Sequence, residues 1–112
     1  MEIIKKEQEQ IFKNGNIIAH EYSSTNQNIN IGLVEIKGRH PQQDFLVNEK
    51  VTELVYLIKG TAILNTETNK FNLSEGDFAI ISPNEKYFWE GDCTVITPCT
   101  PAWTLEQNKI VK

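Results

Sequence analysis

The chain has 112 residues, of which 39% are hydrophobic and 23% are charged, as is typical of one soluble globular domain. Its net charge of −4 and its single arginine, Arg39, exclude the basic surface that nucleic-acid binding needs. No apolar run reaches the ~18 residues of a membrane-spanning helix. We therefore expect neither a nucleic acid nor a membrane as a partner.

The cysteine content and the N-terminal residues indicate the compartment. The two cysteines, Cys93 and Cys99, do not make a disulfide framework. Residues 1–10 are charged and lack the apolar core of a secretory signal. Reduced thiols without an export signal are typical of the cytoplasm, so we expect a cytoplasmic protein whose two thiols are free and buried.

The first third of the chain consists of short apolar runs separated by polar turns. Residues 2–12 predict either one amphipathic helix or a leading strand. Residues 17–22 predict a strand, and the polar residues 23–28 predict the turn that ends it. Residues 29–36 alternate apolar and polar side chains as a strand does, and residues 38–44 predict a loop.

The rest of the chain continues this β pattern. Residues 52–58 and 61–64 predict two strand segments, with Gly60 as a bend or bulge between them. The remaining strands are expected at residues 71–73, 78–81, 87–89 and 93–97. Residues 90–92 predict a turn, and the tail after Thr104 predicts a short helical turn. Short strands at regular spacing favour a β-sandwich or a small barrel.

The strand at residues 53–59 is apolar on both faces. One face carries Glu53, Val55 and Leu57, and the other carries Leu54, Tyr56 and Ile58. A barrel covers only the inner face of its strands, so the outer face needs another layer or another subunit. Homodimers are the commonest assembly of this kind, and we therefore expect a homodimer.

Two blocks of the sequence resemble the two motifs of the cupin family. Glu53, six further residues and Gly60 are similar to the end of the first motif, and residues 76–84, Gly-Asp-Phe-Ala-Ile-Ile-Ser-Pro-Asn, resemble the second. The proline-rich, aromatic residues 97–103 are similar to the ending of many short bacterial cupins. The resemblance covers about residues 30–105. It implies an all-β double-stranded β-helix, or jelly-roll barrel, in one domain over residues 1–112, with residues 1–28 as an N-terminal extension and leading strands.

The same resemblance allows the metal site of the family to be compared with this chain. Typical cupins hold a divalent metal with two histidines and a glutamate of the first motif and a histidine of the second. These positions fall at Leu46, Asn48, Glu53 and Tyr87, and a shift of the first block by one residue puts Val47 and Glu49 at the two histidine positions instead. No histidine falls on a ligand position, so we expect no metal and no other cofactor. An atypical, oxygen-rich metal site that includes Glu53 and Tyr87 is the alternative.

The resemblance also implies a pocket inside the barrel for a small polar ligand such as a sugar or a carboxylate. We expect Asn48, Glu53 and Tyr87 to orient this ligand. We expect Val55, Leu57 and Trp89 to line the pocket, and His40 to lie near its mouth. The alternative interpretation of His40, and of His20, is a surface or structural histidine.

Three functions remain open at this point. The first is a metal-free protein that binds a small molecule. The second is an acid–base isomerase or epimerase in which Glu53, with a pKa raised by burial, and Tyr87 are the catalytic residues. The third is a dimeric interaction domain without an active site. The sequence does not decide whether the protein is an enzyme.

Overall fold

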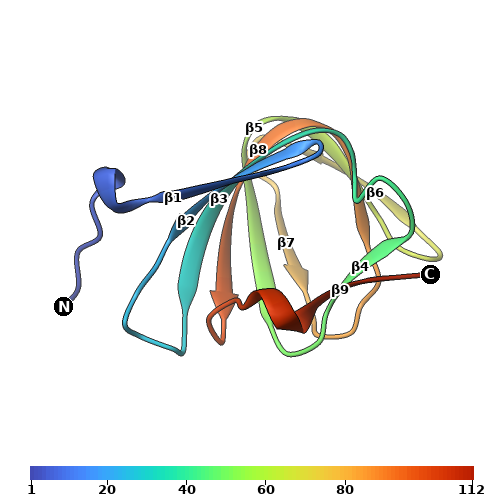
Figure 1. Ribbon diagram of the computed structural model, residues 1–112. Coiled ribbons are helices and arrows are strands. Elements are labelled where there is room, and N and C mark those ends of the chain that lie inside the picture. Colours follow the sequence, from blue (N-terminus) through green and yellow to red (C-terminus); the bar gives the residue numbers. More distant parts are fainter.

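The computed structural model describes all residues from 1 to 112 and consists mainly of β-strands. The strands are β1 (Gln10–Asn14), β2 (Ile17–Tyr22), β3 (Asn30–His40), β4 (Phe45–Asn48), β5 (Thr52–Asn65), β6 (Lys70–Ser74), β7 (Phe78–Ile81), β8 (Phe88–Thr100) and β9 (Asn108–Val111). A short 3₁₀ helix, η1 (Lys6–Gln8), precedes β1, and a second one, η2 (Leu105–Gln107), lies between β8 and β9 (Figure 1). Neither helix is long and apolar enough to cross a membrane.

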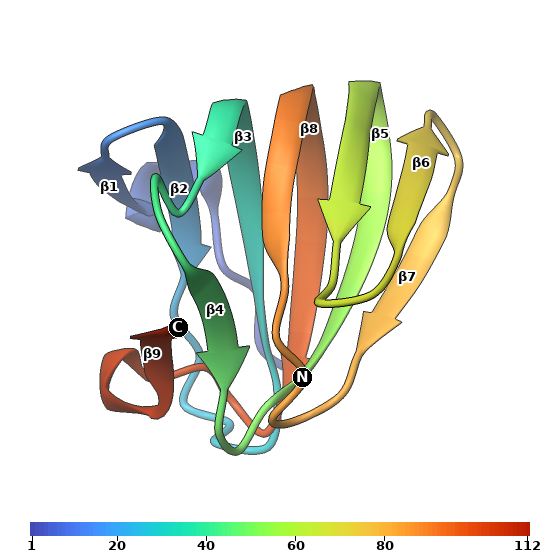
Figure 2. The same cartoon turned by 90° about the vertical axis from the view of Figure 1, so that its right-hand side faces the viewer.

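The strands form one large antiparallel sheet and one small one. The large sheet has the order β1-β2-β3-β8-β5-β6, and β7 also pairs with β5. Strands β4 and β9 pair with each other, and Figure 2 shows this pair in front of one face of the large sheet. The expected all-β jelly-roll fold is confirmed.

The core lies on the inward face of the large sheet. Successive side chains of a strand point to opposite faces, so Val55 and Leu57 of β5 are both fully buried, whereas Tyr56 between them is 45% exposed. Ile36 of β3 and Val95 of β8 pack in the same apolar cluster. In this chain the inner face of β5 is thus covered, whereas Tyr56 and Ile58 of its outer face are partly exposed.

Strands β5 and β8 approach each other closely at two glycines. The register of the pair shifts between Leu57 and Lys59, close to the bend or bulge predicted at Gly60, and the two predicted segments form the single strand β5. Gly60 has a φ of +87°, and a Cβ on it would lie 2.1 Å from the backbone oxygen of Asp92. Gly91 has a φ of +135°, and a Cβ on it would lie 2.6 Å from the backbone oxygen of Thr61. The turn expected at residues 90–92 is therefore wrong, because Gly91 permits this close contact inside one continuous strand.

The two ends of the chain complete the barrel. Residues 2–12 form a short 3₁₀ turn and then β1, because Ile11 and its neighbours pair with β2 instead of continuing a helix. Strand β3 extends to His40, beyond the expected loop start, because its last residues pair with β8. The helical turn after Thr104 is confirmed as η2, and β9, which the sequence did not indicate, follows it.

Candidate functional site

A cavity of about 490 Å³ lies between the inward face of the large sheet and the β4–β9 pair. This volume is within the range of small-molecule sites. Most of the wall is apolar, and Trp103 and Leu105 of the segment after β8 belong to it. The polar side chains of the wall include Glu21, Asn30, His40, Glu53, Tyr87, Thr97 and Asn108.

Asn48, the last residue of β4, joins the site to the C-terminal segment. It is fully buried, and its Oδ1 accepts hydrogen bonds from Gln107 Nε2 at 3.0 Å and Asn108 Nδ2 at 2.9 Å. Its Nδ2 donates to Glu53 Oε1 at 3.5 Å and to the Tyr87 hydroxyl at 3.4 Å. The three residues that we expected to orient a ligand therefore do converge.

The orientation of the Asn48 amide follows from its neighbours. Gln107 Oε1 accepts from the backbone N–H groups of Lys50 at 3.2 Å and Val51 at 3.3 Å, and only an oxygen can accept there. The Gln107 amide nitrogen must then face Asn48 Oδ1, so Asn48 presents its N–H groups to Glu53 and Tyr87. The Tyr87 hydroxyl accepts from Asn48 and keeps its own hydrogen free to donate.

Burial sets the protonation of the two candidate catalytic groups. It raises the pKa of Glu53 to about 7, while the hydrogen bond from Asn48 acts in the opposite direction. Near neutral pH the carboxyl group can therefore either take or give a proton. Burial also raises the pKa of Tyr87 well above its ordinary value, so this phenol stays neutral. Glu53 suits proton transfer, and Tyr87 suits hydrogen-bond donation to a developing negative charge.

The other expected ligand-binding residues divide into two groups. Trp89 and His40 line the cavity, and burial lowers the pKa of His40 so that its ring is neutral at pH 7. Val55 and Leu57 do not line the cavity but lie in the apolar core. The expectation that they form the pocket wall is wrong. Alternation along β5 correctly places both side chains on the inward face, but it does not show whether an inward side chain borders the cavity or is covered by other core residues.

Sequence reasoning missed Glu21 and Gln107. Glu21 shares the inward face of β2 with Ile17 and Ala19, and all three line the cavity. The sequence did contain a signal for Glu21, because a glutamate on the same face of a predicted strand as apolar residues indicates a polar group that points inward. Gln107 gave no such signal, because its partner Asn48 lies 59 residues away in the sequence.

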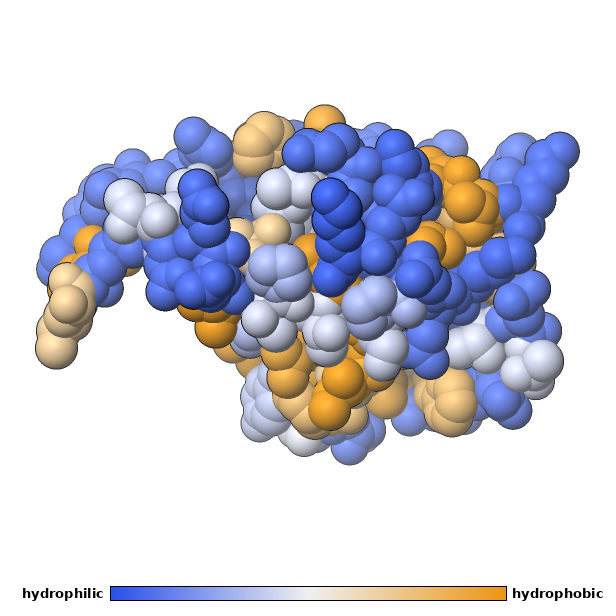
Figure 3. Space-filling view, turned by 90° about the horizontal axis from the view of Figure 1, so that it is seen from below, coloured by the Kyte–Doolittle hydropathy of each residue, from blue (hydrophilic) through white to orange (hydrophobic).

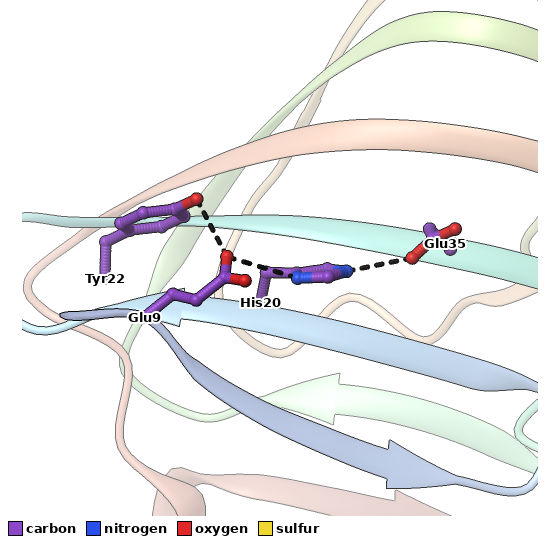
Figure 4. Close-up of polar contacts among 4 residues, drawn as sticks. All are labelled: Glu9, His20, Tyr22 and Glu35. Atoms are coloured by element: carbon purple, nitrogen blue, oxygen red, sulfur yellow. Dashed lines mark hydrogen bonds and ion pairs between the residues drawn. The ribbon is translucent and has the colours of Figure 1, made fainter. Parts of the chain in front are cut away.

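His20 lies outside the cavity, in the cluster that Figure 4 shows. Its Nε2 is 2.8 Å from Glu35 Oε2 and its Nδ1 is 3.2 Å from Glu9 Oε2, to which the Tyr22 hydroxyl also donates at 2.9 Å. The hydrogen bond to Glu35 is the main cause of the raised pKa of His20. This cluster ties the segment before β1 to β2 and β3, which supports a structural role for His20.

Cys93 and Cys99 are both free and buried, as expected. Cys99 also lines the cavity, but burial and the nearby Glu53 raise its pKa strongly. Burial likewise raises the pKa of Cys93, to about 11. Both thiols are therefore protonated near neutral pH and do not act as nucleophiles.

The residues at the metal positions of typical cupins do not fit a metal ion. Leu46 has no donor atom, and Asn48 presents N–H groups to Glu53 and Tyr87, which donate hydrogen bonds and cannot coordinate a cation. Tyr87 stays a neutral phenol. No group of three or more His, Cys, Asp and Glu side chains is arranged to hold a metal ion anywhere in the structure.

Comparisons with known proteins identify the fold. No protein-family model matches the sequence, and no curated protein matches it. Among solved structures, the nucleoside dehydratase Pac13 superposes with a TM-score of 0.89 at 14% identity, over 100% of this chain and 92% of that one. Ectoine synthase from P. lautus gives 0.79 at 13% identity, over 100% and 91% of the two chains. KdgF from Halomonas sp. gives 0.69 at 16% identity, over 89% and 94%. A cupin-like protein from Thermotoga maritima is also similar, so the chain has the fold of the cupins.

Proposed function

We propose that the protein binds a small polar molecule in this cavity and catalyses an acid–base reaction on it, as a lyase or an isomerase. The observation that carries the proposal is the Glu53 carboxyl group, which lies in the cavity without an ion pair and shares the Asn48 amide with Tyr87. A buried carboxyl group with a pKa of about 7 is typical of a general base or acid.

The arrangement suits the removal of a proton next to a carbonyl group. Glu53 takes the proton from the carbon, the electron pair of that C–H bond forms a C=C bond, and the π electron pair of the carbonyl group moves onto its oxygen. The Tyr87 hydroxyl donates a hydrogen bond to this oxygen and stabilises its negative charge. Return of the proton from Glu53 to the neighbouring carbon gives an isomer, whereas an epimer would require a second proton donor on the opposite face of the ligand. Alternatively, the electron pair expels a β-hydroxyl group, which leaves as water with the proton from Glu53.

The structural comparison supports a hydroxyl-bearing ligand with a planar ring. Pac13 is a nucleoside dehydratase, and single-residue variants of Streptomyces Pac13 were solved with uridine at a TM-score of 0.88 to 0.89 to this chain. The cavity of this protein offers Trp89, Tyr87 and Trp103 as aromatic surfaces against which a ring could pack. Nucleosides, sugars and their aldehydes are therefore the first compounds to test.

Proton exchange in D₂O tests this proposal without knowledge of the product. Purified protein is incubated with a panel of nucleosides, sugars and their aldehyde or keto forms, and ¹H NMR follows the loss of signals next to the carbonyl group. We expect exchange or water loss with one compound class. Glu53→Gln should slow it at least about 100-fold, the usual contribution of a general base, and Tyr87→Phe should slow it less.

Binding measurements separate catalysis from binding alone. The control Glu49→Gln makes the same change of charge at an exposed position outside the cavity and should leave the exchange rate unchanged. If Glu53→Gln exchanges protons as fast as the wild type, Glu53 is not the base. If compounds raise the melting temperature but none exchanges a proton, the protein is a binding protein and the catalytic part of the proposal fails.

A further inference from the structure

A second carboxyl group faces the same cavity as Glu53. The carboxylate of Glu21, on β2, lies over Gly32 of the neighbouring strand β3. A Cβ on Gly32 would lie 3.5 Å from Glu21 Oε2 and 3.2 Å from Thr97 Oγ1. Gly32 is buried and is not among the residues with positive φ. A Cβ on Gly32 would thus crowd Thr97 Oγ1 and would only touch Glu21 Oε2, so the backbone at Gly32 lies in contact distance of both polar groups.

The strand register brings the two carboxyl groups to one region of the cavity wall. Glu21 pairs with Gly32, and Gly32 pairs with Thr97 of β8. Glu53 pairs with Cys99, which lies two residues further along the same strand and faces the same side as Thr97. Burial raises the pKa of Glu21, and the proximity of Glu21 adds to the effect of burial on the pKa of Glu53.

No firmly held cation neutralises this pair. The ion pairs of the chain lie elsewhere and join His20 to Glu9 and Glu35, and Lys86 to Glu67. Arg39 lies over the Phe88 ring, 3.9 Å from its centroid, and does not line the cavity. The basic residues on the cavity wall are Lys13, which is exposed, and His40, which is neutral at pH 7 because burial lowers its pKa.

We infer that Glu21 and Glu53 together make the cavity selective for uncharged, hydroxyl-bearing ligands over their phosphorylated or carboxylated forms, with Glu21 as the specificity-determining residue. This inference rests on the proposed function. The two carboxyl groups can accept hydrogen bonds from ligand hydroxyl groups, whereas an anionic ligand would bring another negative charge beside them in a water-poor space. Of the two ligand classes expected from the sequence, sugars are therefore favoured over carboxylates.

Matched pairs of compounds test the inference. The dissociation constants of uridine and uridine 5′-phosphate, and of ribose and ribose 5-phosphate, are measured by calorimetry at pH 7.5. We expect the wild-type protein to bind the neutral member of a pair at least about 100-fold more tightly, since like charges across an interface are strongly unfavourable. Glu21→Gln, which keeps the shape of the side chain, should reduce this ratio at least about tenfold.

The control variant is Glu49→Gln, which removes one negative charge outside the cavity and should leave the ratio unchanged. Equal binding of both members by the wild type, or an unchanged ratio in Glu21→Gln, overturns the inference but leaves the proposed function standing. Binding of neither member of any pair overturns both. Selective binding of the neutral member without any proton exchange supports the inference and contradicts the catalytic proposal.

Discussion

The most consequential single residue is Glu53, because its ionisation opposes folding. Its pKa is raised to about 7, whereas a glutamate in an unfolded chain titrates near about 4.3. The folded state therefore holds this proton more tightly than the unfolded state does. The contribution of Glu53 to stability is most favourable below the unfolded pKa and is lost as the pH rises through about 7.

Glu53→Gln should therefore stabilise the protein at high pH. At pH 8 we expect the free energy of unfolding to rise by up to about 3 kcal/mol, and at pH 4.5 we expect almost no change. Urea denaturation at both pH values measures this difference. The control variant Glu49→Gln changes an exposed side chain and should leave the free energy of unfolding at pH 8 nearly unchanged. A Glu53→Gln protein that is less stable than the wild type at pH 8 would contradict the raised pKa.

At the level of residues, motif spacing in the sequence predicted the three polar residues at the centre of the site, but it did not predict the second carboxyl group of the cavity wall, Glu21. Asn48, Glu53 and Tyr87 could be located because they occupy fixed positions relative to glycine and proline in two sequence blocks. Glu21 could not be placed in the same region as Glu53, because their proximity depends on the pairing of β2, β3, β8 and β5, to which no local motif refers. One of the two missed residues, Glu21, is thus the one to which we assign the selectivity of the cavity.

At the level of elements, the close pairing of β5 with β8 depends on glycine. At Gly60, positive φ combines with a neighbouring backbone oxygen that would lie 2.1 Å from a Cβ, so any side chain requires the strands to separate. We expect Gly60→Ala to lower the free energy of unfolding by more than about 3 kcal/mol, or to prevent folding. Thermal denaturation followed by circular dichroism measures the loss.

Gly76 offers the matched control for this prediction. It also has positive φ, at +92°, but nothing lies within 4 Å of a Cβ placed on it. Gly76→Ala should therefore show only the conformational cost of about 1–2 kcal/mol. Equal losses in the two variants would mean that backbone conformation, and not the close approach of β8, explains the glycine at position 60.

The same strand pair contains the segment whose secondary structure was predicted wrongly. Residues 90–92 have the composition of a turn, and local reasoning ends a strand there. In the structure Gly91 pairs with Gly38 on one side and Ala62 on the other, so long-range pairing overrides the local turn preference. Most other strands were predicted correctly, because the residues with turn-like composition that border them do form turns in the structure.

At the scale of the whole molecule, the outer face of the large sheet carries an apolar patch. Two rows of side chains cross β3, β8, β5 and β7, and they are Leu33, Ile96, Tyr56 and Phe78 in one row and Ile31, Pro98, Leu54 and Ile80 in the other. Four of these are between 42% and 58% exposed, namely Ile31, Tyr56, Phe78 and Ile80. Figure 3 shows that, on the face seen from below, apolar residues gather in patches within a largely hydrophilic surface.

The area of this patch agrees with what a homodimer requires. With the neighbouring Ile58, the exposed side chains present on the order of 500 Å² of apolar surface, close to the apolar share of the roughly 800 Å² that each partner contributes to a standard interface. A second copy brings an identical sheet face, and two such faces can pack as the layers of a β-sandwich do. The homodimer expected from the sequence therefore stays a prediction, now with a defined surface.

Sedimentation velocity at about 50 µM tests this surface. We expect the wild type to have twice the 12.8 kDa mass of the chain, and Tyr56→Glu to sediment as a folded monomer, because the new charge would be buried without a partner at the centre of the interface. Phe71→Glu changes a residue that is also exposed, at 49%, but lies outside the two rows, and it should remain dimeric. The predicted interface would be contradicted if the wild type were a monomer at this concentration, or if the Tyr56→Glu variant remained a dimer.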